Sequence, residues 1–551
     1  MRNMLIEREA ITRLQAVAIA VIIAVAVIGG IYYYVIMGPT PTTEEKKIIF
    51  TYPFQQIVST IDPAKATDET SCCAVINMYD PLFFPVKFEN GTRKTVPWLV
   101  EEWFVSEDGM TYTMKLKEGI KFHDGTELTA EDVAFSMDRM LSIGMGFSYL
   151  WEGVLQPGDT EVVDKYTFKF HLRKPYSPFI STLIQLFVVN KKLIMEHLEP
   201  GDFGEYGDYG QKYLEDHDAG SGPYKLKSWE RGVEIVFEKF DDYWRGWKEN
   251  SPTEVHCKVI LEEATVVTLF KKGELDMTHM WLTPETFEEL KQIPGVIVDE
   301  DLALQIFHIP MNMKKPPTDN KWFRYAICYA FDYETACELA GGAPQAEGPV
   351  PLPVEGHAED VLVFHRNVTL AQYYLNKSGY KPGEVTIDIV YITAVELERK
   401  ICLLLKSNLE EIGIGVNIIG ETWGRLCDLA TSPETAPHLS CIYDRMKTLH
   451  PDSHTYGKYH SSVQGTWRSI SWMENSTIDS ILEQARATAD PEEALELYKE
   501  AQRLITYEAP AIFVFNNIHR IAMHDWVKGY VDPGIMSFDL YWWNLEIIGR
   551  D

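Results

Sequence analysis

The chain has 551 residues, of which 46% are apolar and 24% charged, and its 51 basic against 81 acidic side chains give a formal net charge of −30. A nucleic-acid-binding protein needs a predominantly basic surface, so this balance excludes that class. Aromatic residues make up 12% of the chain, which excludes a disordered acidic protein, and eight Cys are too few for a disulfide-dense scaffold.

Residues 14–37 form an uncharged, apolar run of 24 residues near the N-terminus. A helix rises about 1.5 Å per residue and a bilayer core is roughly 30 Å thick, so we expect a transmembrane helix here. Three Arg precede the run, and Glu44 and Glu45 follow it. This asymmetry predicts residues 1–13 in the cytoplasm and a Thr/Pro stalk over residues 38–46 that carries the rest of the chain outside the cell membrane.

Processing of this segment is predicted from its flanks. No Cys follows the apolar run, which excludes a bacterial lipoprotein anchor, and no small-x-small cleavage site follows Met37, which favours retention. Residues 9–15 are similar to the pilin-type signal peptide of some archaeal surface proteins, which is cut before the hydrophobic segment and leaves it in place. Four N-x-S/T sequons are compatible with an extracellular glycoprotein. They lie at Asn90, Asn367, Asn376 and Asn475.

After the stalk the chain alternates strand-like and helix-like segments. Lys46 to Tyr52 predicts an opening strand that ends at Pro53, and Thr111 to Lys117 alternates with period two, as a half-buried strand does. Thr129 is a helix N-cap with two acids in the following turn, and the helix should end near Gly144.

The C-terminal half predicts a βαβ unit. Residues 385–391 alternate as a strand, residues 397–412 place apolar side chains on one helical face, and residues 413–419 alternate again. This order predicts a parallel, helix-covered sheet and an α/β fold. Asp490 and Pro491 then open an amphipathic helix over residues 492–505.

Enzyme motifs are missing from the sequence. It lacks a G-x-S-x-G elbow, an H-E-x-x-H helix, a G-x-x-x-x-G-K-[ST] loop and a C-x-x-C pair. We therefore expect no enzyme and no cofactor. A cluster of possible metal ligands contains Pro451, which rules out a regular helix, and its spacing fits no standard site, so we expect no metal. The cluster comprises His450, Asp452, His454 and His460.

Two short motifs have structural interpretations. Gly220-Ser221-Gly222-Pro223 predicts a turn, because Pro223 lacks the amide donor that a phosphate cradle needs. Cys72 and Cys73 cannot readily pair with each other. The sequence leaves two possibilities open for them: a structural pair of thiols, or a disulfide to another Cys.

Several further segments follow one another in a specific order. They are Val96-Pro97-Trp98-Leu99, Ser106-Glu107-Asp108-Gly109, Phe122-His123-Asp124-Gly125-Thr126, Leu128-Thr129-Ala130-Glu131-Asp132-Val133, Gly220-Ser221-Gly222-Pro223-Tyr224, Asp241-Asp242-Tyr243-Trp244-Arg245-Gly246 and Val527-Lys528-Gly529-Tyr530. Together they resemble the signature of the family 5 extracellular solute-binding proteins, the oligopeptide-, dipeptide- and nickel-type receptors of ABC importers. The resemblance covers essentially residues 47–545.

The fold that this resemblance implies is a two-lobed, periplasmic-binding-protein-like α/β fold after the N-terminal transmembrane helix. Lobe one would comprise residues 47–305 and 512–551, with an insertion subdomain at about 95–220, and lobe two residues 306–511. A ligand would lie in the cleft between the lobes. Closure about the hinge would present it to the permease subunits of the importer, which needs no covalent chemistry.

The resemblance also implies ligand contacts in two segments. In peptide-binding relatives a loop after a motif like Ile61-Asp62-Pro63-Ala64 runs beside the ligand. The corresponding residues here are Thr67, Asp68, Glu69, Thr70 and Ser71. The second segment contains an aromatic residue and then an Asp that pairs with the amino group of the peptide, shortly before a Pro. Here it runs from Cys441 to Asp452 and includes Tyr443 and Arg445.

The expected Asp is not in its place in this second segment. Counting back from Pro451 without gaps places Lys447 at its position, and a cation there would repel an ammonium group. A small insertion would give the role to Asp444, and Asp452 is a third candidate. Trp423 is either a wall of the pocket or an ordinary packing residue.

These contacts leave the ligand class open. Peptides are the expected ligands. Oligosaccharides, which some members of the family bind, need aromatic platforms and neutral hydrogen-bonding groups and are the alternative. A surface hydrolase is the alternative of another class, and no candidate nucleophile or acid pair supports it.

Overall fold

The computed structural model describes residue 18 and residues 47–550. The predicted cytoplasmic segment at 1–13, transmembrane helix at 14–37 and stalk at 38–46 lie outside the described residues, apart from Ala18. Among the residues that are described, no helix is both long and apolar enough to cross a bilayer. The chain divides into two compact units, Met1–Lys47 and Ile48–Asp551, and all named helices and strands belong to the second.

A four-stranded sheet with the order β1-β10-β9-β8 begins the second unit. Its strands are β1 (Ile49–Phe54), β8 (Tyr224–Glu230), β9 (Glu234–Lys239) and β10 (Glu254–Val259), of which only β1 and β10 pair in parallel. The predicted opening strand is present, but its predicted end at Pro53 is wrong. Because β1 lies at the edge of the sheet, a residue without an N–H fits inside the strand.

A second antiparallel sheet has the order β4-β5-β7-β6, and a hairpin of β2 and β3 precedes it. The strands are β2 (Phe83–Lys87), β3 (Arg93–Pro97), β4 (Val100–Val105), β5 (Thr111–Leu116), β6 (Thr160–Val162) and β7 (Thr167–His171). Strand β5 confirms the half-buried strand predicted at residues 111–117, because every second side chain in it is buried.

The helices among these strands begin with α2 and α3. The bounds are α2 (Glu69–Met78), α3 (Ala130–Ile143), α4 (Phe179–Thr182), α5 (Lys191–Glu196), α6 (Glu263–Lys271) and α7 (Pro284–Leu290). Helix α3 confirms the predicted one: the Asp132 carboxylate accepts hydrogen bonds from the Thr129 amide and hydroxyl, both at 2.8 Å. Gly144 ends the helix in the left-handed region at φ 67°.

The predicted βαβ unit is confirmed further along the chain. Strands β12 (Thr386–Ile392) and β13 (Gly415–Glu421) pair in parallel and are joined by helix α11 (Glu396–Glu411). Strand β14 (Leu439–Ser440) pairs with the other edge of β12.

More helices accompany this sheet. They are α8 (Lys321–Ala330), α9 (Tyr333–Leu339), α10 (Val368–Lys377), α12 (Trp423–Leu429), α13 (Tyr456–Tyr459), α14 (Ser476–Ala487) and α15 (Pro491–Glu508). Helix α15 begins as predicted, with the Asp490 side chain accepting a hydrogen bond from the Glu493 amide at 2.9 Å.

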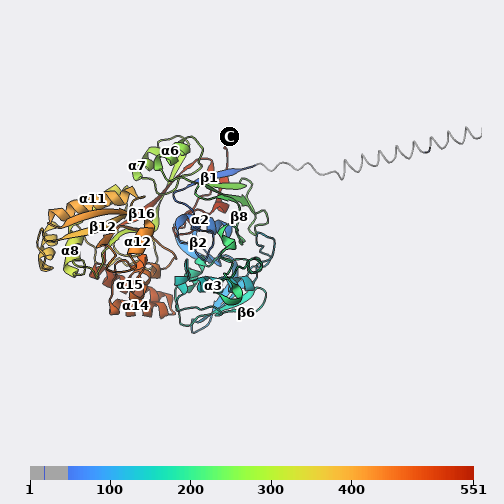
Figure 1. Cartoon of the computed structure of the whole chain (residues 1–551), viewed down its shortest axis with the longest axis horizontal. Helices are drawn as coiled ribbons and strands as arrows, with labels where there is room; N and C mark the ends of the chain where they lie inside the picture. Colours follow the sequence, from blue (N-terminus) through green and yellow to red (C-terminus); the bar gives the residue numbers. More distant parts are fainter. Residues whose placement is uncertain (1–17, 19–46, 551) are drawn as a thin grey trace, which may run out of the picture. The chain divides into compact units, whose positions relative to one another are not determined.

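Two long antiparallel strands, β11 (Val296–Pro310) and β16 (Ala511–His524), connect two separate hydrophobic cores. One core is built mainly from residues between 50 and 304 together with residues 521–547, and the other mainly from residues 307–441. Along β11, Leu304 belongs to the first core and Phe307 to the second. The α/β unit therefore has two lobes, with β1, β2 and α3 in one and α8, α11 and β12 in the other (Figure 1).

The two short motifs have clear structural roles. The eight Cys are all free thiols, so neither Cys72 nor Cys73 forms the disulfide that the sequence left open. A Cβ on Gly220 would lie 1.8 Å from the carbonyl oxygen of Met78, so the turn needs glycine because two backbones meet there.

Candidate functional site

The predicted contact segment between Cys441 and Asp452 begins as strand β15 (Ile442–Arg445), which pairs with β11. Side chains alternate along a strand, so Tyr443 and Arg445 face one side and Asp444 faces the other. These residues therefore belong to two different environments.

Asp444 is completely buried, and two ammonium groups occupy its carboxylate. Lys447 Nζ lies 2.6 Å from Oδ1, and Lys458 Nζ lies 2.6 Å from Oδ2. Burial by itself would raise the pKa of Asp444, but the two lysines hold that pKa well below its usual range. This carboxylate is ionised, and each of its oxygens lies within ion-pair distance of a lysine ammonium.

The second lysine is only partly stabilised in its charged form. Burial lowers the pKa of Lys458 to about 7; the attraction of Asp444 opposes this shift and the repulsion of Lys447 adds to it. Two lysines thus share one carboxylate, and both lie over the ring of Trp467, with Nζ 4.0 Å from the centroid for Lys458 and 5.2 Å for Lys447.

Arg445 belongs to a separate charge cluster on the other side of β15. Its Nη2 donates to both carboxylate oxygens of Asp532 at 2.7 Å, and its Nη1 is ion-paired with Asp539. Burial and then Asp539 raise the pKa of Glu69, while Arg445 opposes the shift. Glu69 also accepts a hydrogen bond from Trp281 Nε1 at 2.8 Å. The cluster thus links the predicted loop to the predicted strand segment.

The remaining predicted loop residues start helix α2. Asp68 is its N-cap and accepts hydrogen bonds from the Ser71 amide and the Thr70 hydroxyl, both at 2.9 Å. Thr70 and Ser71 are buried, and only Thr67 is exposed. Except for Thr67, the polar groups of this loop already have partners within the protein.

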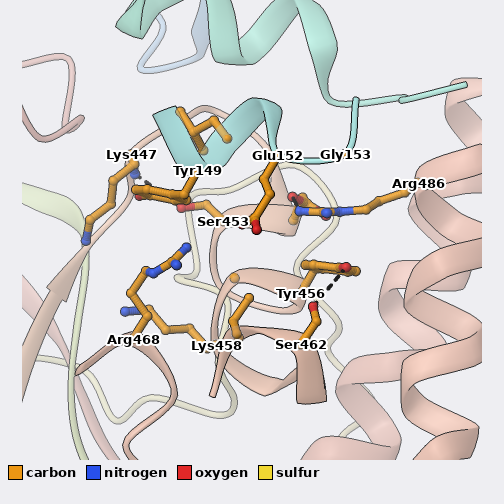
Figure 2. A pocket seen from close by; sticks show the side chains of 14 residues that line it. Tyr149, Glu152, Gly153, Lys447, Ser453, Tyr456, Lys458, Ser462, Arg468 and Arg486 are labelled. Atoms are coloured by element: carbon orange, nitrogen blue, oxygen red, sulfur yellow. Dashed lines mark hydrogen bonds and ion pairs between the residues drawn. The ribbon is translucent and has the colours of Figure 1, made fainter. Parts of the chain in front are cut away.

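Lys447 and Asp452 line a cavity of about 220 Å³, shown in Figure 2. One wall is a 3₁₀ turn, η1 (Ser148–Trp151), with the two residues that follow it. The opposite wall comes from residues 447–468, and Arg486 of α14 adds to it. Tyr149 and Glu152 face the cavity from the first wall, and Lys458 and Arg468 lie on the second. Segments far apart in the sequence thus meet around it.

The lining of this cavity is rich in cationic donors. Arg486 pairs with Asp452 through two hydrogen bonds of 2.8 and 2.7 Å, so this pair is neutral. Arg468 lies over the ring of Tyr149, 3.9 Å from its centroid, and makes no hydrogen bond or ion pair with another residue in the described part of the chain. Such a lining suits a ligand group that accepts hydrogen bonds.

The structure thus divides the predicted contact residues. It places Lys447 and Asp452 in the cavity wall and Asp444 directly behind it, whereas Tyr443 and Arg445 lie with Glu69. Tyr443 packs edge-on against Trp281 at 5.6 Å. Trp423 is 40% exposed and packs against Trp467 at 5.0 Å, and it does not line the cavity.

Twelve of the fourteen lining residues were missing from the sequence-based prediction, among them Tyr149, Lys458, Arg468 and Arg486. The signal available for the second wall was a Trp-Arg pair close after a Lys-Tyr-His sequence, at residues 458–468. No comparable signal marks Tyr149, because its role depends on a contact made across the fold.

The suspected metal cluster is dispersed. His450 Nδ1 accepts a hydrogen bond from the Asp452 amide at 3.2 Å, and His454 Nε2 lies 3.1 Å from the Asp444 carbonyl oxygen. Within the described residues, no group of three or more His, Cys, Asp or Glu side chains is arranged to hold a metal ion.

Comparisons with known proteins agree with this architecture. The profile of "Bacterial extracellular solute-binding proteins, family 5 Middle" matches residues 94–478, which is more than half of the chain. The probable D,D-dipeptide-binding periplasmic protein DdpA of Escherichia coli (strain K12) is 27% identical over 479 residues, covering 86% of this chain and 89% of DdpA.

Two solved structures share the fold. The periplasmic binding protein DppA from Helicobacter pylori, in complex with peptide STSA, has a TM-score of 0.78 and 23% identity, covering 92% of this chain and 99% of that one. The dipeptide binding protein from Pseudoalteromonas sp. SM9913, in complex with Met-Leu, has a TM-score of 0.79 and 19% identity, covering 91% and 100%. The resemblance stated from the sequence is confirmed, and the chain belongs to the bacterial extracellular solute-binding proteins of family 5.

Proposed function

We propose that this protein is the peptide-binding receptor of an ABC importer. The observation that carries the proposal is a cavity between two walls distant in sequence, in a two-lobed chain of the solute-binding family. The names of the relatives support peptides as the ligand class: DdpA is described as D,D-dipeptide-binding, and the two solved structures contain peptides.

The proposed mechanism is closure of two lobes around the ligand. Lobe one comprises residues 47–305 and 512–551, including the insertion subdomain at about 95–220, and lobe two comprises residues 306–511. Strands β11 and β16 are the proposed hinge, because each has residues in both hydrophobic cores. A ligand that contacts both lobes stabilises the closed state, and the permease subunits recognise that state. No covalent step is required, so the protein acts as a receptor and not as an enzyme.

The proposed ligand contacts are drawn from both predicted segments. Lys447 and Asp452 contact the ligand from the cavity wall, with Asp444 holding Lys447 in place. The second set of proposed contacts comes from Glu69, Arg445 and the loop of residues 67–71, which lie near Tyr443 and outside the lining of the cavity in Figure 2. Trp423 has the weakest support, because it lies outside the cavity lining.

The proposed location is the outer face of the cell membrane. Residues 14–37 would anchor the chain, and residues 38–46 would hold the receptor away from the bilayer. Asn90, Asn367 and Asn376 are exposed, which leaves these sequons open to glycan attachment.

Ligand capture tests the proposal directly. The purified chain is incubated with a mixture of random peptides and with a mixture of oligosaccharides, and mass spectrometry identifies what is retained. We expect intact peptides. Retention of oligosaccharides alone would overturn the peptide assignment, and cleaved products would indicate a hydrolase.

Deletion of residues 1–39 tests the anchor. The truncated protein should leave the membrane fraction and still retain the same peptides, because residues 48–551 form a compact unit of their own. A truncated protein that stays with membranes, or that loses its ligand, would contradict the proposed anchor and stalk.

A further inference from the structure

The cavity has a charge pattern that points to one chemical group of the ligand. We infer that it binds a carboxylate of the ligand, through Arg468 together with Lys458 and Lys447, and that it does not receive the ligand's ammonium group. This inference rests on the proposed function and specifies which end of the peptide binds in this cavity.

The first reason is that Asp444 is unavailable to a ligand. Its side chain is completely buried, and its two oxygens are occupied by Lys447 Nζ and Lys458 Nζ, each at 2.6 Å. An incoming ammonium would have to displace a lysine and would meet both positive charges first. The carboxylate therefore positions the lysines and does not bind cations from the ligand.

The second reason is the unpaired guanidinium of Arg468. It lies over Tyr149, with Cζ 3.9 Å from the ring centroid, and has no acceptor among the described residues. The contact with the ring holds the guanidinium at the cavity, where its planar fork of donors matches a carboxylate. Lys458 lies on the same wall, as Figure 2 shows.

The acidic residues of the lining do not cancel this preference. Asp452 is held by Arg486 through two hydrogen bonds and also accepts one from the Tyr498 hydroxyl at 2.8 Å. Glu152 has no ion pair within the described chain, but it is exposed and therefore screened by water. Apart from the pair of Asp452 and Arg486, the charged lining residues that are not exposed are cationic: Lys447, Lys458 and Arg468.

The size of the cavity fits this partial role. About 220 Å³ is below the roughly 300–1,000 Å³ of sites that enclose a whole drug-sized ligand. The cavity therefore accommodates one end of a peptide, and the rest of the ligand extends beyond it.

The test compares three chemical forms of one mixture of random tetrapeptides: unmodified, N-acetylated and C-terminally amidated. The full chain, in detergent, is equilibrated with each form, and retained peptides are counted by mass spectrometry. We expect the unmodified and acetylated forms to be retained and the amidated form to be retained at least about tenfold less. Loss of the acetylated form with retention of the amidated form, equal retention of all three, or retention of neither any peptide form nor the uronic acid oligosaccharide described next would overturn the inference.

A fourth and a fifth probe separate this inference from the proposed function. Retention of an oligosaccharide of uronic acids, with no peptide retained, would overturn the peptide receptor and uphold the carboxylate site. Retention of a neutral oligosaccharide to the same extent would overturn both.

Variants locate the effect. R468Q should lower retention of the unmodified and acetylated forms about tenfold and leave the amidated form unchanged. R468K keeps the positive charge and should lower retention less than R468Q does. R503Q removes another Arg of the same lobe, paired with Asp360 at the surface, and should change nothing. E152Q removes a negative charge that faces the cavity and should not lower retention of the unmodified and amidated forms, which carry a free amine; their selective loss would place the ammonium in this cavity and overturn the inference. Thermal denaturation verifies that each variant is folded.

Discussion

Asp444 shows how a side chain acquires a different role once its neighbours are known. The family resemblance makes it a candidate partner for a ligand ammonium. In the structure it is the only carboxylate, within the described residues, that pairs with Lys447 or Lys458. It therefore belongs to a buried charge network, and we propose that it acts on the ligand only through Lys447 and Lys458.

Asp444→Asn should destabilise the fold by about 3–5 kcal/mol, because it leaves two buried ammonium groups without their carboxylate. Chemical denaturation at pH 7 measures the change. Asp360→Asn, at the exposed pair with Arg503, is the matched control and should have little effect. If Asp444→Asn keeps wild-type stability and loses only ligand, Asp444 binds the ammonium after all.

Lys458 should make ligand binding depend on pH. Its pKa is lowered to about 7 by burial; Asp444, Lys447 and Arg468 act on it most strongly, and His308 and His454 also face it. A carboxylate prefers protonated Lys458, so affinity should be greatest below pH 7 and should fall as the pH rises through 7 to 8.

Titration calorimetry with one retained peptide at pH 6, 7 and 8 checks this dependence. The fall should reach at most about tenfold per pH unit, and Lys458→Met should flatten it. An affinity that rises with pH would contradict the protonation of Lys458 as a determinant of binding.

Helices and strands with strong local signals could be predicted from the sequence. Helices α3 and α15 have capping residues and periodic apolar faces, and both begin where the caps predict. In the βαβ unit of β12, α11 and β13, the spacing of apolar residues changes from strand to helix and back to strand. The parallel pairing of the two strands follows from this order. The end of β1 could not be predicted, because whether a strand accepts Pro53 depends on its edge position in the sheet.

Glu398, in the first turn of α11, should lower stability as the pH rises. It is 2% exposed, and burial raises its pKa to about 8, with the Ile392 amide donating a hydrogen bond to it at 2.6 Å. The pKa of Glu398 in the folded state lies above its value in the unfolded state. The loss of folding stability from this buried carboxyl is therefore absent below the unfolded pKa and grows until the pH reaches about 8.

Glu398→Gln should therefore be more stable than the wild type by about 2–4 kcal/mol at pH 8, and by less than about 1 kcal/mol at pH 5. Urea denaturation at both pH values measures the difference. Glu396→Gln, on the exposed face of the same helix, should show no such gain. Equal stability of Glu398→Gln and the wild type at pH 8 would show that the buried carboxyl carries no cost.

The turn at residues 220–223 should tolerate no side chain at its first position. Gly220→Ala places a Cβ 1.8 Å from the Met78 carbonyl oxygen, so the two backbone segments must separate, at a cost of about 1–3 kcal/mol. Gly424→Ala in α12 meets nothing within 4 Å and should be neutral or stabilise by up to about 1 kcal/mol. Thermal denaturation compares them, and a fully stable Gly220→Ala would contradict the close approach.

For the molecule as a whole, the net charge of −30 does not predict the chemistry of the cavity. The acidic surface is spread over the chain, while Lys447, Lys458, Arg468 and Arg486 meet in one place. The family and the α/β class could be predicted from ordered motifs and periodicity, because motifs and periodicity are local features of the sequence. The cavity could not, because Tyr149 and Arg468 become neighbours only through folding.

Small-angle X-ray scattering of the full chain, with and without a retained peptide, measures whether the two lobes close around the ligand. Binding should lower the radius of gyration, and Arg468→Gln should require more peptide to reach the same value. Peptide retained with no change in the scattering curve would contradict capture by closure between the lobes.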